Sequence, residues 1–253
     1  MPRAARKKSR SGIYHVIMRG INKQTIFEED DDKIKFLETL KKYKPICNFQ
    51  IYSYCLMDNH IHLLLKESEE PISEVIKRIS SSYVFWYNMK YERCGHLFQD
   101  RYKSENVESR ASFFTVLRYI HQNPLKAGLV KNVFDSKWTS INEYVRKANM
   151  VDIDFGLNLI SIDRKEAVNQ FVTYMQEVNN DQCLEYKEKV RMADSEVLEH
   201  LSRLGITNIR SLQKMERAKR NEILVMIKEL NGVTLRQLSR ITGISKSVIH
   251  KAR

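Results

Sequence analysis

Two histidines stand one residue apart in the segment His60-Ile61-His62, which continues into three leucines. Because side chains alternate between the two faces of a β-strand, His60 and His62 project to the same side if this segment is a strand. Two imidazoles on one strand face can bind a metal ion. Most His-x-His pairs are incidental, however, and several classes of metalloenzyme use one, so the pair alone does not define a site.

A tyrosine and an asparagine lie four residues apart in the helical segment that follows Ser109. At about 100° per residue, Tyr119 and Asn123 are about 40° apart on one helix face. That face lies beside the apolar stripe of the helix, which consists of Phe113, Val116, Leu117 and Ile120. A phenol can act as a nucleophile and a carboxamide can act as a ligand. The alternatives are a half-buried tyrosine that only packs and an asparagine that caps the helix before Pro124.

The elements that must position these residues follow from the spacing of apolar and turn residues. Four strands are predicted, at residues 13–19, 49–56, 60–66 and about 101–108. Three helices are predicted, at residues 28–44, 71–90 and 109–123, with Pro45 and Pro124 expected to end the first and the third. The order β, α, β, β, α, β and one more helix is that of a ferredoxin-like split βαβ fold. We therefore expect an α+β protein, with an antiparallel sheet, helices on one face and the other face free to carry a site.

The composition excludes several classes of protein. The chain has 253 residues with 43 Lys and Arg against 31 Asp and Glu, a formal net charge of +12. A hydrophobic content of 42% argues against wholesale disorder. No apolar run approaches the ~20 residues of a membrane span, and the basic start lacks a signal-like stretch, so we expect a cytoplasmic protein with no membrane partner. The four cysteines form no CxxC pair, which favours reduced packing thiols over a zinc ribbon or disulfides.

The positive charge is concentrated at the two ends of the chain. Residues 1–27 hold seven basic residues and no acidic one, and residues 208–253 hold eleven basic residues against three acidic ones. Residues 151–200 carry eleven acidic residues against five basic ones. Because a phosphate backbone is bound largely through Lys and Arg, this distribution suggests two separate sites for a polyanion. A basic surface that binds no nucleic acid is the alternative.

The last part of the chain has the pattern of two short helices joined by a glycine turn. Residues 235–242 and 246–253 are predicted as helices, with Gly243 between them and Val248 and Ile249 packing inward. A second helix with a basic outer side is typical of a helix-turn-helix that enters the major groove of duplex DNA. An αα-hairpin without DNA contacts is the alternative. The candidate DNA-binding residues here are Arg236, Lys246, Ser247, His250 and Lys251.

Four ordered motifs carry a resemblance to a known family. They are Tyr14-His15-Val16 with Arg19-Gly20-Ile21-Asn22, Met57-Asp58-Asn59-His60-Ile61-His62-Leu63-Leu64-Leu65, Phe98-Gln99-Asp100-Arg101-Tyr102-Lys103-Ser104 and Tyr119-Ile120-His121-Gln122-Asn123-Pro124. With these motifs, residues 11–146 resemble the IS200-like single-tyrosine transposases of the HUH type, and within them most of all the REP-associated tyrosine transposases. The predicted organisation is a catalytic domain at 1–146, a helical connector at 147–207 and a helix-turn-helix DNA-binding region at 208–253, which the resemblance does not reach.

The resemblance implies that His60 and His62 bind a divalent metal, that Tyr119 is the nucleophile and that Asn123 is the third metal ligand. In the insertion-sequence branch the last position is typically Gln, so Asn123 favours the REP-associated branch. The implied activity is cleavage and transfer of single-stranded DNA beside a palindromic hairpin, through a 5′-phosphotyrosine and a free 3′-OH. The implied metal is Mg²⁺ or Mn²⁺. A site with two histidines suits Mn²⁺ as well or better, because Mg²⁺ prefers oxygen ligands.

Basic and aromatic residues beside the expected strands are candidates for contacts with the single strand. These are Arg19, Arg101, Tyr102 and Lys103, each of which could instead be solvated surface. One tyrosine forms one covalent link, so the exchange of two DNA ends needs either a homodimer or a second round of reaction. Two other functions stay open. One is a non-catalytic DNA-binding regulator on a domesticated core, and the other is a metal-dependent nuclease without a covalent step.

Overall fold

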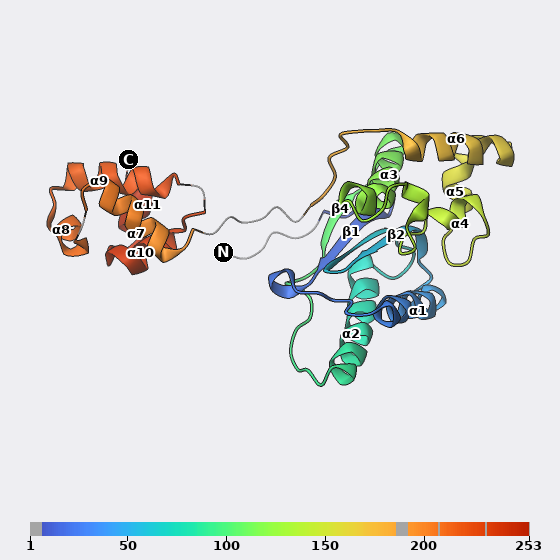
Figure 1. Ribbon diagram of the computed structural model, residues 1–253, viewed down its shortest axis with the longest axis horizontal. Coiled ribbons are helices and arrows are strands. Elements are labelled where there is room, and N and C mark those ends of the chain that lie inside the picture. Colours follow the sequence, from blue (N-terminus) through green and yellow to red (C-terminus); the bar gives the residue numbers. More distant parts are fainter. Residues whose placement is uncertain (1–6, 186–191, 207, 231, 253) are drawn as a thin grey trace. The chain divides into compact units, whose positions relative to one another are not determined.

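The computed structural model describes residues 7–185, 192–206, 208–230 and 232–252, and the chain divides into two compact units, Met1–Glu185 and Tyr186–Arg253 (Figure 1). Each unit has its own hydrophobic core. Parts of the predicted basic ends and of the predicted connector lie outside the described residues, namely Arg3, Arg6, Arg253 and residues 186–191. The observed division differs from the predicted boundaries after residues 146 and 207.

A four-stranded antiparallel sheet forms the centre of the first unit. Its strands are β1 (Ile13–Arg19), β2 (Gln50–Met57), β3 (His60–Lys66) and β4 (Lys103–Asn106), in the spatial order β2-β3-β1-β4. Two helices connect them, α1 (Asp30–Cys47) and α2 (Ile72–Lys90). The chain order β1, α1, β2, β3, α2, β4 is the predicted ferredoxin-like order.

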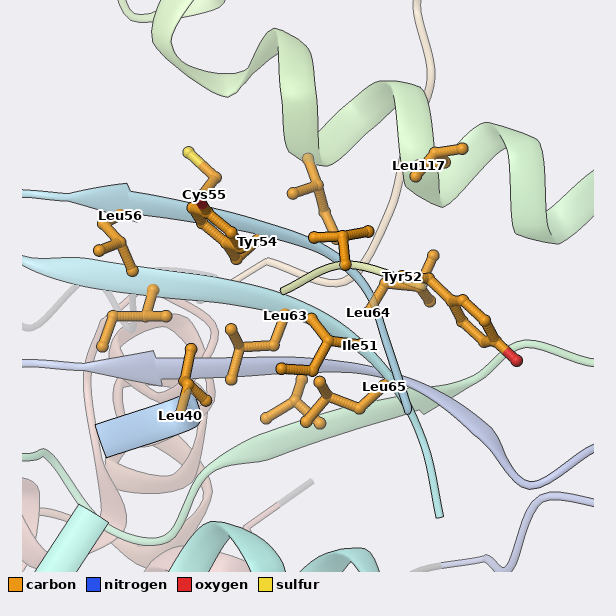
Figure 2. Close-up of a cluster of buried hydrophobic side chains, with 14 of the residues drawn as sticks. Leu40, Ile51, Tyr52, Tyr54, Cys55, Leu56, Leu63, Leu64, Leu65 and Leu117 are labelled. Carbon is orange, nitrogen blue, oxygen red and sulfur yellow. The ribbon is translucent and has the colours of Figure 1, made fainter. Parts of the chain in front are cut away.

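Helices cover both faces of this sheet. On one face, Phe36 of α1 meets Tyr83 of α2 with 5.3 Å between ring centroids. On the other face, Phe113 of α3 (Arg110–Lys126) packs against Tyr52 of β2, and Figure 2 shows Leu40 and Leu117 on opposite sides of the strands. The expectation of helices on one face only was therefore wrong for α3. The strands β2 and β3 are buried along almost their whole length, so both of their faces must be covered.

Two helices continue past a proline that the sequence predicts as their end. α1 runs through Pro45 to Cys47, and α3 runs through Pro124 to Lys126. Proline removes the amide that would donate to the residue four positions earlier, so the packing of both helices against the rest of the first unit must outweigh this loss. Left-handed residues follow both ends instead, Asn48 with φ 50° and Gly128 with φ 71°. Asn123 therefore lies inside α3 and is not its C-cap.

Further helices complete the first unit, and most of them contact α3. They are η1 (Ile21–Lys23), η2 (Val133–Asp135), α4 (Ile141–Val145), α5 (Ile153–Asn158) and α6 (Arg164–Gln176). Tyr144 of α4 and Phe171 of α6 stack with 4.5 Å between their centroids, and both lie in the main core. Two helices of the predicted connector, α5 and α6, thus belong to the body of the first unit.

The second unit is entirely helical in the residues described. It contains α7 (Asp194–Arg203), α8 (Ile209–Lys214), α9 (Arg217–Lys228), α10 (Leu235–Thr242) and α11 (Lys246–Lys251). Val197 and Leu201 of α7 are buried with Leu212, Leu224 and Leu238, so α7 is part of this core and not of a connector. Gly243, with φ 68°, joins α10 to α11. Val248 is 39% exposed, which corrects the expectation that it packs inward with the buried Ile249.

Two features of the composition can be followed in the structure. All four cysteines are free, and Cys47 and Cys55 are buried as packing thiols. Cys94 is exposed, so the packing interpretation was wrong for this residue. Among the described residues, none of the helices has the length and apolar character needed to cross a membrane.

Candidate active site

His60 and His62 project from β3 toward α3. One residue separates them, so they share a strand face, and their rings meet at 79° with 5.0 Å between centroids. The Tyr119 ring of α3 lies 5.6 Å from that of His62. Packing of α3 on the sheet therefore brings together three of the residues predicted from the sequence.

Asn123 completes this cluster from the next turn of α3. Its side chain lies close enough to both His60 and Tyr119 to favour a higher pKa for His60 and a lower pKa for Tyr119. Arg19 at the end of β1 is paired with His60 in the strand register, and its positive charge contributes to lowering the pKa of His60. A nucleophilic side chain, two imidazoles, a carboxamide and a guanidinium thus meet at one end of the central strands.

Burial sets the protonation of the two histidines. His62 is 2% exposed, and burial, followed by repulsion from His15 and His60, holds its pKa well below the usual range. Burial also lowers the pKa of His60, although the Asn123 side chain acts in the opposite direction. Both rings are therefore neutral at pH 7, the form in which imidazole binds metals.

The Tyr119 hydroxyl is buried and has an acidic partner. The residue is 5% exposed, and its Oη donates a hydrogen bond of 2.8 Å to Glu185 Oε1. Burial raises the pKa of Tyr119, and the hydrogen bond to Glu185 raises it further. Lys126 Nζ lies 5.5 Å from the centre of the same ring. The phenol is thus protonated at neutral pH, with its proton directed at a carboxylate.

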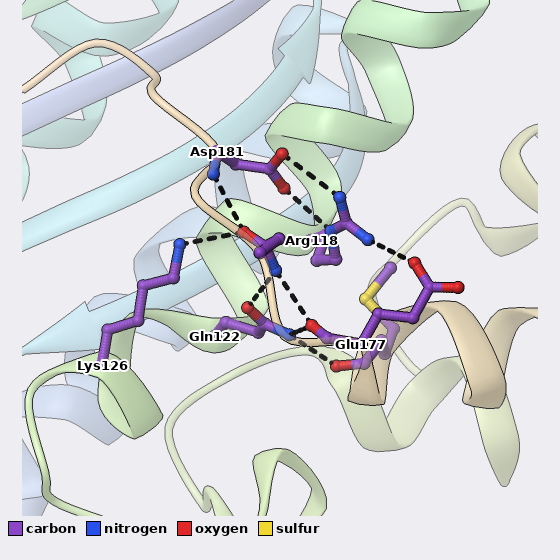
Figure 3. Close-up of polar contacts among 7 residues, drawn as sticks. Arg118, Gln122, Lys126, Glu177 and Asp181 are labelled. Atoms are coloured by element: carbon purple, nitrogen blue, oxygen red, sulfur yellow. Dashed lines mark hydrogen bonds and ion pairs between the residues drawn. The ribbon is translucent and has the colours of Figure 1, made fainter.

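Glu185 is the last residue of the segment 177–185, which follows α6 and runs along α3. Arg118 holds this segment: its Nε and Nη2 donate to Asp181 at 2.8 and 3.2 Å, and its Nη1 donates to Glu177 at 2.7 Å (Figure 3). Gln122 adds a 3.0 Å hydrogen bond to the Glu177 carbonyl oxygen. These contacts fix where Glu185 can lie relative to Tyr119.

Three neighbours of the cluster are not among the residues predicted from the sequence. His15 of β1 is fully buried with its Nε2 3.1 Å from His62 Nδ1, and Asn59 Oδ1 lies 2.6 Å from His60 Nδ1. Strand alternation could have found His15, because it precedes Arg19 by four residues and shares its face of β1. Glu185 could not be found in this way, since it is 66 residues from Tyr119 in the sequence.

The remaining candidate DNA contacts lie in both units. In the first unit, Arg101 is exposed, and Tyr102 and Lys103 are partly exposed at the start of β4. In the second unit the exposed candidates are Arg236 on α10 and Lys246, Ser247, His250 and Lys251 on α11.

A comparison with known protein families gives a match to the first unit. The model for IS200-like transposases matches residues 8–123, from the residues before β1 to Asn123. Residues 8–123 therefore match the IS200-like transposase family. This match confirms the family resemblance carried by the sequence motifs. No curated protein gives a significant match to the chain.

Two solved structures are similar to this chain. The structure of a REP-associated tyrosine transposase bound to a REP hairpin has a TM-score of 0.51 and 18% identity, over 61% of this chain and 90% of that chain. The fold is thus shared with that protein. A predicted transposase from Deinococcus radiodurans R1 has a TM-score of 0.35 and 15% identity, over 48% of this chain and 97% of that chain.

Proposed function

We propose that the chain is a metal-dependent single-stranded DNA endonuclease and strand transferase that cleaves beside palindromic hairpins through a 5′-phosphotyrosine on Tyr119. The observation that carries this proposal is the meeting of His60, His62, Tyr119 and Asn123 at one end of β3 and α3. A phenol nucleophile beside metal donors is what covalent phosphoryl transfer requires. The family match supports a transposase, and the similar structure was obtained with a REP hairpin.

The donor set fits a divalent metal. Asn59 engages Nδ1 of His60 and His15 engages Nδ1 of His62, so Nε2 of each ring is the nitrogen left for a ligand role. Within the described ranges, no group of three or more His, Cys, Asp or Glu side chains is arranged as a metal site, so the Asn123 amide is needed as the third donor. Two imidazoles and an amide oxygen suit Mn²⁺ as well as Mg²⁺. A bound metal would polarise the scissile phosphate.

Tyr119 supplies the covalent step. Its Oη forms the new bond to phosphorus while the bond from phosphorus to the 3′ oxygen breaks, which leaves the 5′ end on the tyrosine and a free 3′-OH on the other fragment. The phenol loses its proton in this step toward Glu185, the carboxylate to which it donates in the structure, and the departing 3′ oxygen gains a proton from water. Because one phosphoester replaces another, the strands can be rejoined without nucleotide hydrolysis.

The single strand is proposed to run over the end of β1 and the start of β4. Arg19 lies opposite His60 in the register and is suited to hold a phosphate oxygen near the cluster. Arg101 and Lys103 would contact neighbouring phosphates, and the partly exposed Tyr102 would stack on a base. A tyrosine that stacks on a base favours an unpaired strand, because the bases of a duplex are already stacked.

The second unit is proposed to bind duplex DNA. Its helices α10 and α11 and the turn at Gly243 have the size of a helix-turn-helix, and the outer side of α11 carries two lysines and a histidine. A unit with its own core can bind a duplex while the first unit binds a single strand. Exchange of two DNA ends is proposed to use a homodimer or two successive rounds, because each chain provides one Tyr119.

The test is formation of a covalent adduct. The protein is incubated with Mn²⁺ and single-stranded hairpin DNA that carries a 5′ extension, and the products are separated in SDS. The wild-type chain is expected to give an SDS-resistant protein–DNA adduct, and Tyr119→Phe is expected to give none. Tyr43→Phe is the matched control, because Tyr43 is a partly exposed tyrosine of α1.

Other outcomes separate the alternatives. Cleavage that persists in Tyr119→Phe and needs the metal would show a nuclease that activates water at His60 and His62. A chain that binds the DNA and never cleaves it would be a regulator on a domesticated core. Either result contradicts the tyrosine mechanism.

A further inference from the structure

His15 is a buried polar group that the proposed chemistry does not use directly. It lies in the middle of β1, is 0% exposed and stacks against the His62 ring at 23° with 5.3 Å between centroids. Its Nε2 is 3.1 Å from His62 Nδ1. A completely buried imidazole destabilises the folded state unless its nitrogens have hydrogen-bond partners. One of the two rings must therefore supply the hydrogen of this contact, and the other must accept it.

The other nitrogen of His15 faces a carboxylate. Its Nδ1 is 3.6 Å from Glu105 Oε2, longer than a hydrogen bond, and Glu105 is the residue opposite His15 in the pairing of β1 with β4. Within the part of the chain that the structure describes, this Nδ1 has no closer hydrogen-bond partner. A negative charge in this position favours the His15 tautomer that carries its hydrogen on Nδ1, since an N–H dipole directed at a carboxylate is stabilised.

This choice determines the tautomer of His62. If Nδ1 of His15 carries the hydrogen, its Nε2 has only a lone pair and must accept the shared proton from His62 Nδ1. The Nε2 of His62 then has no hydrogen and is a lone-pair donor. His60 shows the same arrangement, because its Nδ1 lies 2.6 Å from the Asn59 side-chain oxygen, which can only accept.

We propose that His15, oriented by Glu105, is a positioning residue that holds His62 in the tautomer and ring orientation needed to bind a metal. The contacts run from Glu105 to His15 Nδ1 and from His15 Nε2 to His62 Nδ1, and they leave the lone pair of His62 Nε2 for the metal. The proposal rests on the proposed function, because it assigns His62 to the metal. Side chains that fix the second nitrogen of a ligating histidine set both its orientation and its basicity.

The first test reads the tautomers directly in the wild-type chain without metal or DNA. Long-range ¹H–¹⁵N correlation spectra of ¹⁵N-histidine protein distinguish the two neutral forms of each of the seven histidines. His15 and His62 are both expected to carry hydrogen on Nδ1. A spectrum that shows His62 with hydrogen on Nε2 would overturn the proposal. Because this measurement uses only the wild-type chain, its result does not depend on whether a variant folds.

The second test uses two variants of the full chain and measures Mn²⁺ affinity by electron paramagnetic resonance without DNA. His15→Phe keeps a ring of similar shape but removes the acceptor, and affinity is expected to fall by about 10- to 100-fold. His15→Gln retains an acceptor and a donor, and is expected to stay within about threefold of wild type because the hydrogen bond to His62 persists. Equal affinity in wild type and His15→Phe, or equal loss in both variants, would contradict the positioning role.

The two proposals fail differently. A wild-type chain that binds no Mn²⁺ and forms no adduct would overturn the metal-dependent function, while the tautomer spectrum would still decide the contact between His15 and His62. If the wild type forms the adduct, excess Mn²⁺ is expected to restore adduct formation in His15→Phe. A variant that stays inactive at saturating metal would show that His15 acts on another step and would refute the proposal.

Discussion

Arg118 offers a test of how the segment 177–185 is held over the candidate active site. Its side chain is 10% exposed and that of its partner Asp181 is 15% exposed, so water screens this ion pair only weakly. The guanidinium also stacks on the Tyr174 ring at 4.0 Å. Arg118→Met keeps most of the packing of the side chain and removes its five donors, which leaves the Asp181 carboxylate without its charged partner.

The expected cost follows from these contacts. The two charged hydrogen bonds to Asp181 contribute about 2 kcal/mol, and the stacking on Tyr174 adds about 1 kcal/mol. The contact with Glu177, whose side chain is 53% exposed, adds at most about 0.5 kcal/mol. A loss of about 3 kcal/mol corresponds to roughly 100-fold more frequent local opening of the segment.

Hydrogen exchange followed by mass spectrometry measures this opening. The amides of Asp181 and Leu184 donate to side chains, to Asn179 at 3.1 Å and to Glu105 at 2.9 Å, so their exchange reports on the segment. Arg118→Met is expected to speed exchange in 177–185 by about two orders of magnitude and to leave β1 and β3 unchanged. Arg164→Met, which breaks an exposed ion pair with Asp154, is the control and should change nothing there. Unchanged exchange in Arg118→Met would refute the role of Arg118.

Two further predictions concern stability and organisation. Asp32 is fully buried at the start of α1; burial alone would raise its pKa, but the Lys90 ammonium at 2.6 Å and further hydrogen bonds hold it below the usual value. Asp32→Asn is therefore expected to lower the free energy of unfolding in urea by about 3 kcal/mol at pH 7. The ion pair stabilises only the ionised form of Asp32, and the ordinary pKa of the carboxyl is 3.8. The difference in unfolding free energy between wild type and variant should therefore persist down to about pH 3.8 and shrink below it, and a constant difference at lower pH would contradict the pairing. A chain that ends at Glu185 keeps the first core and loses the second, so duplex binding in gel-shift assays should fall more than about tenfold while hairpin adduct formation changes less than about threefold. Equal loss of both activities would argue against two DNA sites.

Much of the first unit could be predicted because its signals are local. The alternation of residues along β3 predicts that His60 and His62 share a face, and the four-residue spacing predicts that Tyr119 and Asn123 share a helix face. The two helix ends at Pro45 and Pro124 were mispredicted because the local signal was overridden. Proline disfavours a helix interior, but the packing of both helices in the first unit outweighs its cost here.

What could not be predicted depends on contacts that are distant in the sequence. Glu185 meets Tyr119 only because Arg118 binds Asp181, and Glu105 meets His15 only because β4 pairs with β1. No spacing rule links such positions. The place of α7 in the second unit has the same origin, since its apolar residues give no indication of the core they will join.

The location of the DNA on the protein tests the central claim most directly. After reaction with the hairpin that carries a 5′ extension, the DNA attached to the protein is trimmed with a nuclease, and the adduct is digested with trypsin and analysed by mass spectrometry. Trypsin cuts after Arg118 and Lys126, so residues 119–126 form a peptide in which Tyr119 is the only tyrosine. We predict that this peptide carries the nucleotide remnant through a phosphotyrosine. A remnant on any of the other eleven tyrosines, or cleaved DNA without a modified peptide, would contradict the account.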